Sequence, residues 1–143
     1  MAGDQPRRVP LVVLGGGPGG YPAAFAAADE GLEVTVVDDG DGPGGTCLRT
    51  GCIPSKALLH VARVISDASD VAASGVTYGP PAIDLDRLRA WKHEVVTALG
   101  GGVTQLAAAR SVEWIQARGV LRDAHTLALD SGQGDTSLLG FDR

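Results

Sequence analysis

The chain has 143 residues, of which 44% are hydrophobic and 20% charged, and its net charge at pH 7 is −5. These values are typical of one globular domain with a real core, and the acidic balance argues against nucleic acid or an anionic membrane as a partner. No stretch of the sequence is apolar for long enough to cross a bilayer.

Two arginines near the start of the sequence, Arg7 and Arg8, are followed by the apolar residues 9–14 (VPLVVL). A twin-arginine export signal also starts with such a pair, but its apolar core is a continuous helix former. Here the sequence GGGPGG interrupts the apolar run, so we expect the cytoplasm as the compartment. We expect residues 9–14 to form one strand, buried on both faces of a parallel sheet, with an unpaired edge.

A glycine motif follows this strand directly. Gly15, Gly17 and Gly20 fill the pattern G-x-G-x-x-G, and an alanine-rich helix is predicted from about Pro18 to Glu30. Gly31 ends that helix, residues 33–37 form a second strand, and Asp38 lies at the end of this strand. This order, residues 9–38, is the arrangement of a dinucleotide-binding unit.

Each motif residue has a physical role in such a unit. Gly15 permits the tight turn, Gly17 lets the backbone approach a pyrophosphate, and Gly20 lets the helix pack on the strand. The helix start, with Pro18 and Gly19, offers free N–H groups to phosphate, and Asp38 can accept hydrogen bonds from a ribose. A G-x-G-x-x-G pattern alone also occurs in glycine loops that bind no nucleotide. Pro22, expected as about the fifth helical residue, predicts a kink.

The two cysteines of the chain lie in the segment GGTCLRTGCIPSK, residues 44–56. Cys47 and Cys52 are five positions apart, which in a regular helix is an axial rise of about 7.5 Å. A disulfide needs Cα atoms within about 4.4–6.8 Å. The two can therefore form a bridge only where the backbone leaves the ideal helix, as Gly51 and Pro54 permit.

A redox role for these cysteines fits better than a structural one, because so short a loop gives a disulfide little stabilising effect. Pro54 is expected as the first residue of a helix that runs to about residue 73. Cys52 would then lie at the positive end of the helix dipole, and Lys56 would add positive charge. The alternatives are two unrelated cysteines or a zinc site. The spacing disfavours zinc, so no metal is expected.

The second half of the chain predicts a long helix and then strands. Asp84 is a plausible N-cap for a helix over residues 84–110, and its glycines, 100–102, predict a bend or a close approach. Residues 112–117 (VEWIQA) are expected to form the third parallel strand. Short antiparallel strands follow at residues 120–121, 126–130 and 137–141.

The segment GGTCLRTGCIPSKALLH resembles the active-site segment of the flavin-dependent pyridine nucleotide–disulfide oxidoreductases, and its ALLH ending looks most like the dihydrolipoamide dehydrogenases. Residues 83–103 (IDLDRLRAWKHEVVTALGGGV) extend the resemblance. It implies an α/β fold, a Rossmann-like FAD-binding domain with a parallel sheet, long helices and an antiparallel β-meander, incomplete at its C-terminus. Its parts would be residues 9–38, a redox-disulfide helix at 44–73, a helix at 84–110, and the third strand with the meander at 111–143.

The resemblance also implies a reaction. Dihydrolipoamide would reduce a Cys47–Cys52 disulfide, with Cys47 forming the mixed disulfide and Cys52 passing electrons to FAD, which reduces NAD⁺. Lys56 would contact the flavin. Further contacts with FAD are implied for Gly44, Gly45, Thr46, Cys47 and Gly119, the last beside the adenine.

The implied partners are a 2-oxoacid dehydrogenase complex and a second subunit of a homodimer. The NAD and dimerisation domains of the family would follow Arg143, so this chain alone is expected to lack turnover. A non-catalytic FAD-binding fragment and a relative of mercuric or glutathione reductase are the alternatives.

Overall fold

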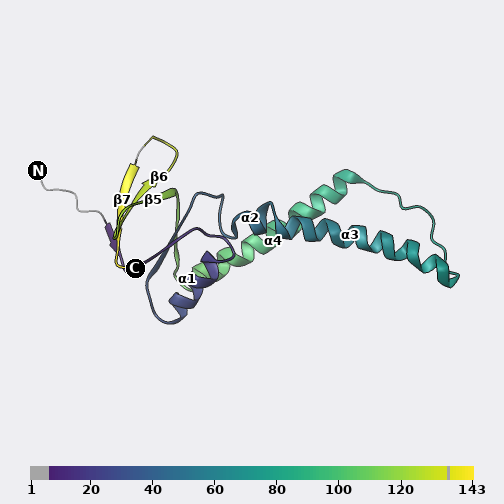
Figure 1. Ribbon diagram of the computed structural model, residues 1–143, viewed down its shortest axis with the longest axis horizontal. Coiled ribbons are helices and arrows are strands. Elements are labelled where there is room, and N and C mark those ends of the chain that lie inside the picture. The colour runs from purple at the N-terminus through teal and green to yellow at the C-terminus, as the bar shows by residue number, and fades with distance from the viewer. Residues whose placement is uncertain (1–6, 135) are drawn as a thin grey trace, which may run out of the picture. The chain divides into compact units, whose positions relative to one another are not determined.

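The computed structural model describes residues 7–134 and 136–143, which form two compact units (Figure 1). The first unit holds the chain up to Gly45 together with Gly100–Arg143, and the second is Thr46–Leu99. The elements in chain order are β1 (Arg7–Val9), β2 (Leu11–Leu14), α1 (Gly20–Asp29), β3 (Val34–Asp38), α2 (Gly45–Arg49), α3 (Cys52–Asp70), a 3₁₀ helix η1 (Val71–Ser74), α4 (Leu85–Ala109), β4 (Glu113–Gln116), β5 (Arg118–Asp123), β6 (Thr126–Asp130) and β7 (Thr136–Phe141).

The parallel sheet that the sequence predicts is present in the first unit. Its order is β2-β3-β4, and β3 is the central strand. Val34 and Val36 of β3 are fully buried in a cluster with Ala24 and Phe25 of α1 and Ala107 of α4. The α/β fold class is therefore confirmed, and β3 carries the centre of the core.

A second sheet, with the order β1-β7-β6-β5, contains the predicted antiparallel meander (Figure 1). The prediction of one strand over residues 9–14 is wrong, because β1 joins this sheet, parallel to β7, whereas β2 joins the other. Pro10 separates the two strands. It has no N–H to donate to a ladder and its φ is fixed, so the chain can leave one sheet and enter the next there.

The first helix differs from the sequence prediction in its start. It begins at Gly20 instead of Pro18, and Gly31 ends it as expected, with φ of +84°. Pro22 is thus the third helical residue instead of about the fifth. The first four N–H groups of a helix have no partner within it, so a proline there removes no hydrogen bond and the reason for expecting a kink is lost.

The predicted cysteine helix over residues 44–73 is divided into α2, α3 and η1. The helix α3 begins at Cys52, so Pro54 is its third residue and not its first. The N-cap at Asp84 is confirmed, since its Oδ1 accepts hydrogen bonds from the N–H groups of Asp86 (3.1 Å) and Arg87 (3.0 Å).

The helix α4 continues through all three glycines at residues 100–102, where a bend or a close approach was expected, and Gly100 is buried, as a close approach requires. A buried glycine within a long packed helix shows that tertiary contacts outweigh low helix propensity. In the described part of the chain, no helix combines the length and the apolar character that a membrane span requires.

Candidate functional site

The glycine motif forms a tight turn at the end of β2 in the first unit. Gly15 has φ of +99°, and its N–H donates to the Val37 carbonyl at 2.7 Å. A Cβ on Gly20 would lie 2.9 Å from the Gly15 carbonyl carbon and closer still to its oxygen. Among the described residues, no atom lies within 4 Å of the position of a Cβ on Gly17. Gly15 and Gly20 are therefore required for the turn itself, and Gly17 leaves its backbone open to a ligand.

The start of α1 follows from this turn. Pro18 and Gly19 complete it, and the N–H groups of Gly20 and Tyr21 both donate to the Gly17 carbonyl, at 2.9 and 3.1 Å. Around Gly19, as around Gly17, the described residues leave open space where a side chain would be. The helix start thus presents small, unobstructed backbone, which is the form that phosphate sites take.

Asp38, the predicted ribose ligand, is already engaged with the backbone. Its Oδ2 accepts a hydrogen bond from the Gly16 N–H at 2.5 Å, and its Oδ1 accepts one from the Gly40 N–H at 2.9 Å. Each carboxylate oxygen has a second lone pair, so the side chain can still accept from a ribose hydroxyl. The structure therefore gives Asp38 a second role, which is to hold the glycine turn against the end of β3.

A pocket of about 190 Å³ lies beside Asp38. It brings together Gly15 and Gly119, which the sequence analysis placed on one cofactor. Its lining residues are Leu14, Gly15, Val37, Asp38, Asp39, Ala117, Arg118 and Gly119. Gly119 is needed here, because a Cβ on it would lie 2.6 Å from Leu14 Cδ1 and 3.1 Å from Val37 Cγ1.

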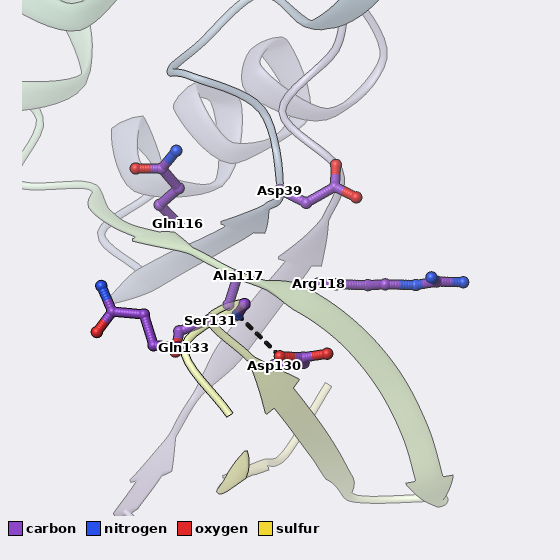
Figure 2. Close-up of a pocket in the computed structure, with 8 residues that line it drawn as sticks. Asp39, Gln116, Ala117, Arg118, Asp130, Ser131 and Gln133 are labelled. Carbon is purple, nitrogen blue, oxygen red and sulfur yellow. Dashed lines mark hydrogen bonds between the residues drawn. The ribbon is translucent and has the colours of Figure 1, made fainter. Parts of the chain in front are cut away.

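A larger pocket of about 600 Å³ shares Asp39, Ala117 and Arg118 with the first (Figure 2). Gln116 is the last residue of β4, Asp39 follows β3, and the turn after β6, with Ser131 and Gln133, completes the lining. This pocket was not predicted from the sequence. Ligands of open α/β sheets bind outside the carboxyl ends of the strands, so the polar residues after β4 were the available signal.

Gly44 and Gly45 pack against the glycine turn. Their φ angles are +107° and +56°, and the Gly44 N–H donates to the Gly16 carbonyl at 2.9 Å. A Cβ on Gly45 would lie 2.7 Å from Gly17 Cα. Both predicted glycines thus meet the G-x-G-x-x-G motif within the first unit, and their lack of side chains makes that approach possible.

The cysteines lie at the junction of two helices in the second unit. Thr46 and Cys47 belong to α2, and Cys52 is the first residue of α3. A Cβ on Gly51 would lie 2.9 Å from the Thr46 carbonyl oxygen and 3.3 Å from Cys47 Cα. The backbone at Gly51 therefore passes so close to α2 that only glycine fits well. This is the departure from an ideal helix that a Cys47–Cys52 bridge requires.

Both cysteines are free thiols in the structure. The pKa of the Cys47 thiol is raised, chiefly by hydrogen bonding with the Cys52 side chain, and its partial desolvation and the charge of Cys52 act in the same direction. The N–H of Cys52 and the positive charge of Lys56 lower the pKa of Cys47 and oppose part of this shift. Cys47 is half-buried, whereas Cys52 is exposed.

The predicted site residues thus form two groups. The glycines, Asp38 and Gly119 lie in the first unit, and Thr46, Cys47, Cys52 and Lys56 lie in the second. Within the described ranges, 7–134 and 136–143, no group of three or more histidine, cysteine or acidic residues could hold a metal ion.

Residues 9–143 match a protein family described as "Pyridine nucleotide-disulphide oxidoreductase". The chain is 46% identical over 132 residues to dihydrolipoyl dehydrogenase of Haemophilus influenzae, an alignment that covers 92% of this chain and 28% of the relative. It is 43% identical over 132 residues to the enzyme of the same name from Vibrio parahaemolyticus, with the same coverage. The Haloferax volcanii enzyme is 38% identical over 141 residues, which cover 96% of this chain and 29% of that protein. The chain therefore spans little more than a quarter of the length of these relatives.

Proposed function

Because the chain belongs to the pyridine nucleotide-disulphide oxidoreductase family, we propose that it binds FAD and carries the redox-active dithiol of a dihydrolipoyl dehydrogenase. The observation that carries this proposal is the close approach of the backbone at Gly51 to Thr46 and Cys47, which brings the start of α3, with Cys52, next to Cys47. Two thiols in contact at the start of a helix can exchange with a disulfide and re-form one.

The first unit fits the adenosine diphosphate part of FAD. The open backbone at Gly17 and Gly19 would hold the pyrophosphate, with the N-terminus of α1 supplying N–H groups and a positive dipole. Asp38 would accept from the ribose, and the pocket that contains Gly15 and Gly119 would hold the adenosine. When bound, FAD supplies an acceptor for the two electrons that a dithiol gives up.

The second unit supplies the dithiol chemistry. In the oxidised protein a thiolate of dihydrolipoamide attacks Cys47, forms a mixed disulfide and releases Cys52 as a thiolate. The second substrate thiol, as its thiolate, then attacks the substrate sulfur, so the cyclic disulfide leaves and Cys47 receives the displaced electron pair and a proton. The protein gains two electrons and one proton, which Cys47 holds, and the substrate loses two electrons and two protons, the second of which passes to solvent. The helix start at Cys52 favours negative charge there, and the raised pKa of Cys47 favours its keeping the proton.

The name of the relatives, dihydrolipoyl dehydrogenase, supports a dihydrolipoyl group as the electron donor, and the family name supports a pyridine nucleotide as the acceptor. We further propose that the donor belongs to a 2-oxoacid dehydrogenase complex, that the acceptor is NAD⁺, and that the whole enzyme is a homodimer. The reversible dithiol suits the reducing conditions of the cytoplasm, which we propose as its compartment.

The test is a visible absorption spectrum of the purified chain after FAD has been added and unbound FAD removed. Retained flavin supports the cofactor site. Addition of dihydrolipoamide to the oxidised protein should yield two new protein thiols, and both Cys47→Ser and Cys52→Ser should abolish that gain while flavin is still retained. If the flavin is retained but no new protein thiols appear after dihydrolipoamide is added, the dithiol proposal is wrong and the chain is only an FAD-binding module. A colourless protein would overturn the cofactor proposal.

A further inference from the structure

Trp114, in β4, lies against the middle of the glycine turn. A Cβ on Gly16 would lie 2.6 Å from Cη2 of the Trp114 ring and closer still to its Cζ2. Real carbon atoms do not approach so closely, so the indole occupies the space that any side chain at position 16 would need. Gly16 is the second residue of G-x-G-x-x-G, where the pattern itself allows any residue. The restriction on it comes chiefly from Trp114, and Asp38 Cγ, at 3.2 Å from the same Cβ position, adds a weaker one.

The Gly16 peptide is also the point at which three segments meet. Its N–H donates to Asp38 Oδ2 at 2.5 Å, and its carbonyl accepts from the Gly44 N–H at 2.9 Å. The first hydrogen bond holds Gly16 against the end of β3, and the second holds it against Gly44. Contact with the indole limits its approach to β4, so its position is set from three sides.

The indole is held there by packing. Trp114 packs against the buried cluster that contains Val36 and Phe25, and its Nε1 is buried without a hydrogen-bond partner among the described residues. A buried N–H without a partner is unfavourable, so a hydrogen bond from Nε1 does not explain the position of the ring. The position is explained by the size and shape of the ring, which fills the space beneath Gly16.

We propose that Trp114 is a positioning residue for the dinucleotide. By supporting Gly16, the indole keeps the backbone of the neighbouring residues Gly15 and Gly17 in the position in which that backbone can contact a pyrophosphate. Trp114 and Gly16 thus act as a pair matched in size, and neither can be changed alone without moving the turn. This inference rests on the proposed FAD site, and it adds a determinant that the glycine pattern does not contain.

The test compares FAD dissociation constants, measured by calorimetry, for the wild-type chain and for Gly16→Ala, Trp114→Val, Trp114→Phe and the double variant Gly16→Ala/Trp114→Val. Gly16→Ala should weaken binding about tenfold or more, because the methyl group must displace the turn or the ring. Trp114→Phe, which keeps a ring against the buried cluster but removes Cζ2 and Cη2 from beneath Gly16, should weaken binding about threefold, and Trp114→Val should weaken it further. The double variant should bind more tightly than Gly16→Ala, since valine leaves room for the methyl group.

Gly101→Ala is the matched control, because Gly101 is exposed in α4 and no described atom lies within 4 Å of its Cβ position. It should leave the dissociation constant unchanged. Circular dichroism at the temperature of the titration identifies the variants that are folded. If Gly16→Ala does not fold, recovery of folding in the double variant supports the size match between Gly16 and Trp114. The effect on FAD binding is then measured with Trp114→Val alone.

The possible failures can be told apart. If the wild-type chain binds FAD and the folded Gly16→Ala and Trp114→Val variants bind it equally well, the positioning role is wrong and the proposed function stands. If Trp114→Val does not improve Gly16→Ala, in binding or in folding, the pairing is wrong. If the wild-type chain binds no FAD, both this inference and the cofactor site are wrong.

Discussion

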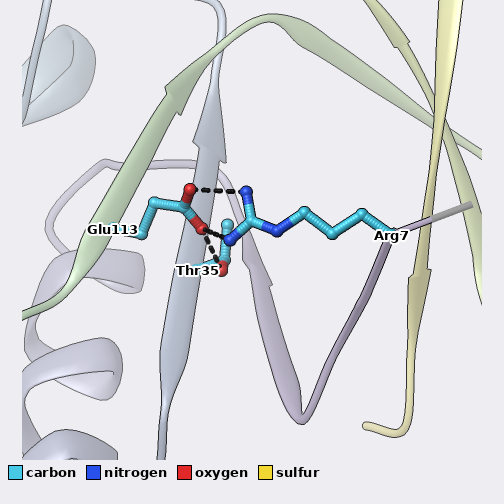
Figure 3. Close-up of polar contacts among 3 residues, drawn as sticks. All are labelled: Arg7, Thr35 and Glu113. Carbon is cyan, nitrogen blue, oxygen red and sulfur yellow. Dashed lines mark hydrogen bonds and ion pairs between the residues drawn. The ribbon is translucent and has the colours of Figure 1, made fainter.

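The guanidinium of Arg7 in β1 donates to both carboxylate oxygens of Glu113 in β4, at 2.6 and 2.5 Å (Figure 3). Each residue lies on an edge strand of a different sheet, so this bidentate pair joins the two sheets of the first unit. Glu113 also accepts a hydrogen bond from the buried hydroxyl of Thr35 at 2.8 Å. One carboxylate therefore serves an ion pair at the surface and a polar group in the core.

Acid should weaken the folded state through Glu113. Its pKa is lowered from 4.5, chiefly by the hydrogen bond from Arg7 and also by the one from Thr35, and the pKa of Arg7 is raised in turn. A carboxyl group with a lowered pKa contributes stability above its ordinary pKa, and that contribution is lost as the pH falls below 4.5 through the folded-state value. Glu113→Gln should therefore lose about 1 kcal/mol at pH 7 and less at low pH, since both groups are partly exposed. Urea unfolding at each pH measures this.

The comparison for that experiment is Asp67→Asn, which removes the more exposed pair between Arg63 and Asp67. Pairs on one helix face contribute only about 0.3–0.5 kcal/mol. An equal effect of the two substitutions would show that Glu113 is an ordinary surface charge.

Gly20→Ala should destabilise the first unit strongly. The added methyl group would meet the backbone carbonyl of Gly15, which cannot rotate away as a side chain could. We expect a loss of about 3 kcal/mol or more, the upper part of the range for overpacking. Gly101→Ala, in open space on α4, should instead stabilise the chain by up to about 1 kcal/mol. Thermal unfolding of both variants tests the difference, and a tolerated Gly20→Ala would mean that the turn can relax.

Gly51→Ala should separate the two thiols. Its methyl group would press on the Thr46 carbonyl and on Cys47 Cα, and the simplest relief is to move α2 away from the start of α3. The Cys47–Cys52 disulfide should then become more easily reduced, which equilibration in glutathione buffers measures as a shift in the oxidised fraction. Gly79→Ala, a substitution in open space in the same unit, should leave that fraction at the wild-type value.

Cys52→Ala should lower the pKa of Cys47. The hydrogen bond between the two side chains is the main cause of the raised pKa, and the substitution removes both that bond and the charge of Cys52. Cys52→Ser should lower it further, because a neutral hydroxyl donates a charge-assisted hydrogen bond to the Cys47 thiolate that alanine cannot make. The pH dependence of alkylation at Cys47, followed by mass spectrometry, gives the pKa of each variant. A pKa of Cys47 that is the same in both variants would contradict this order.

The features that the sequence predicted depend on local chemistry. Gly20 and Gly31 could be assigned because a tight turn or a helix end near them needs a residue without a side chain. Asp84 was identified as an N-cap by the same kind of local requirement. The approach of Cys47 and Cys52 was expected because Gly51 lies between them.

The features that were missed depend on residues distant in the chain. The break at Pro10 was not predicted, and no local signal shows that the two halves join different sheets, since β7 is far away in the sequence. The pair Gly16 and Trp114 is separated by most of the chain, and each residue alone has an ordinary local explanation. The kink at Pro22 was wrongly predicted because the effect of a proline depends on where the helix begins. The helix begins two residues later than expected, and in the first turn a proline removes no hydrogen bond.

The pairing of β1 with β7 has a consequence for how this protein is made. Arg7 lies opposite Leu139 in that ladder, so β1 must wait for β7, which is synthesised much later, before it can pair in this sheet. During synthesis the amino-terminal strand stays exposed, and a chaperone that shields it should raise the yield of folded chains.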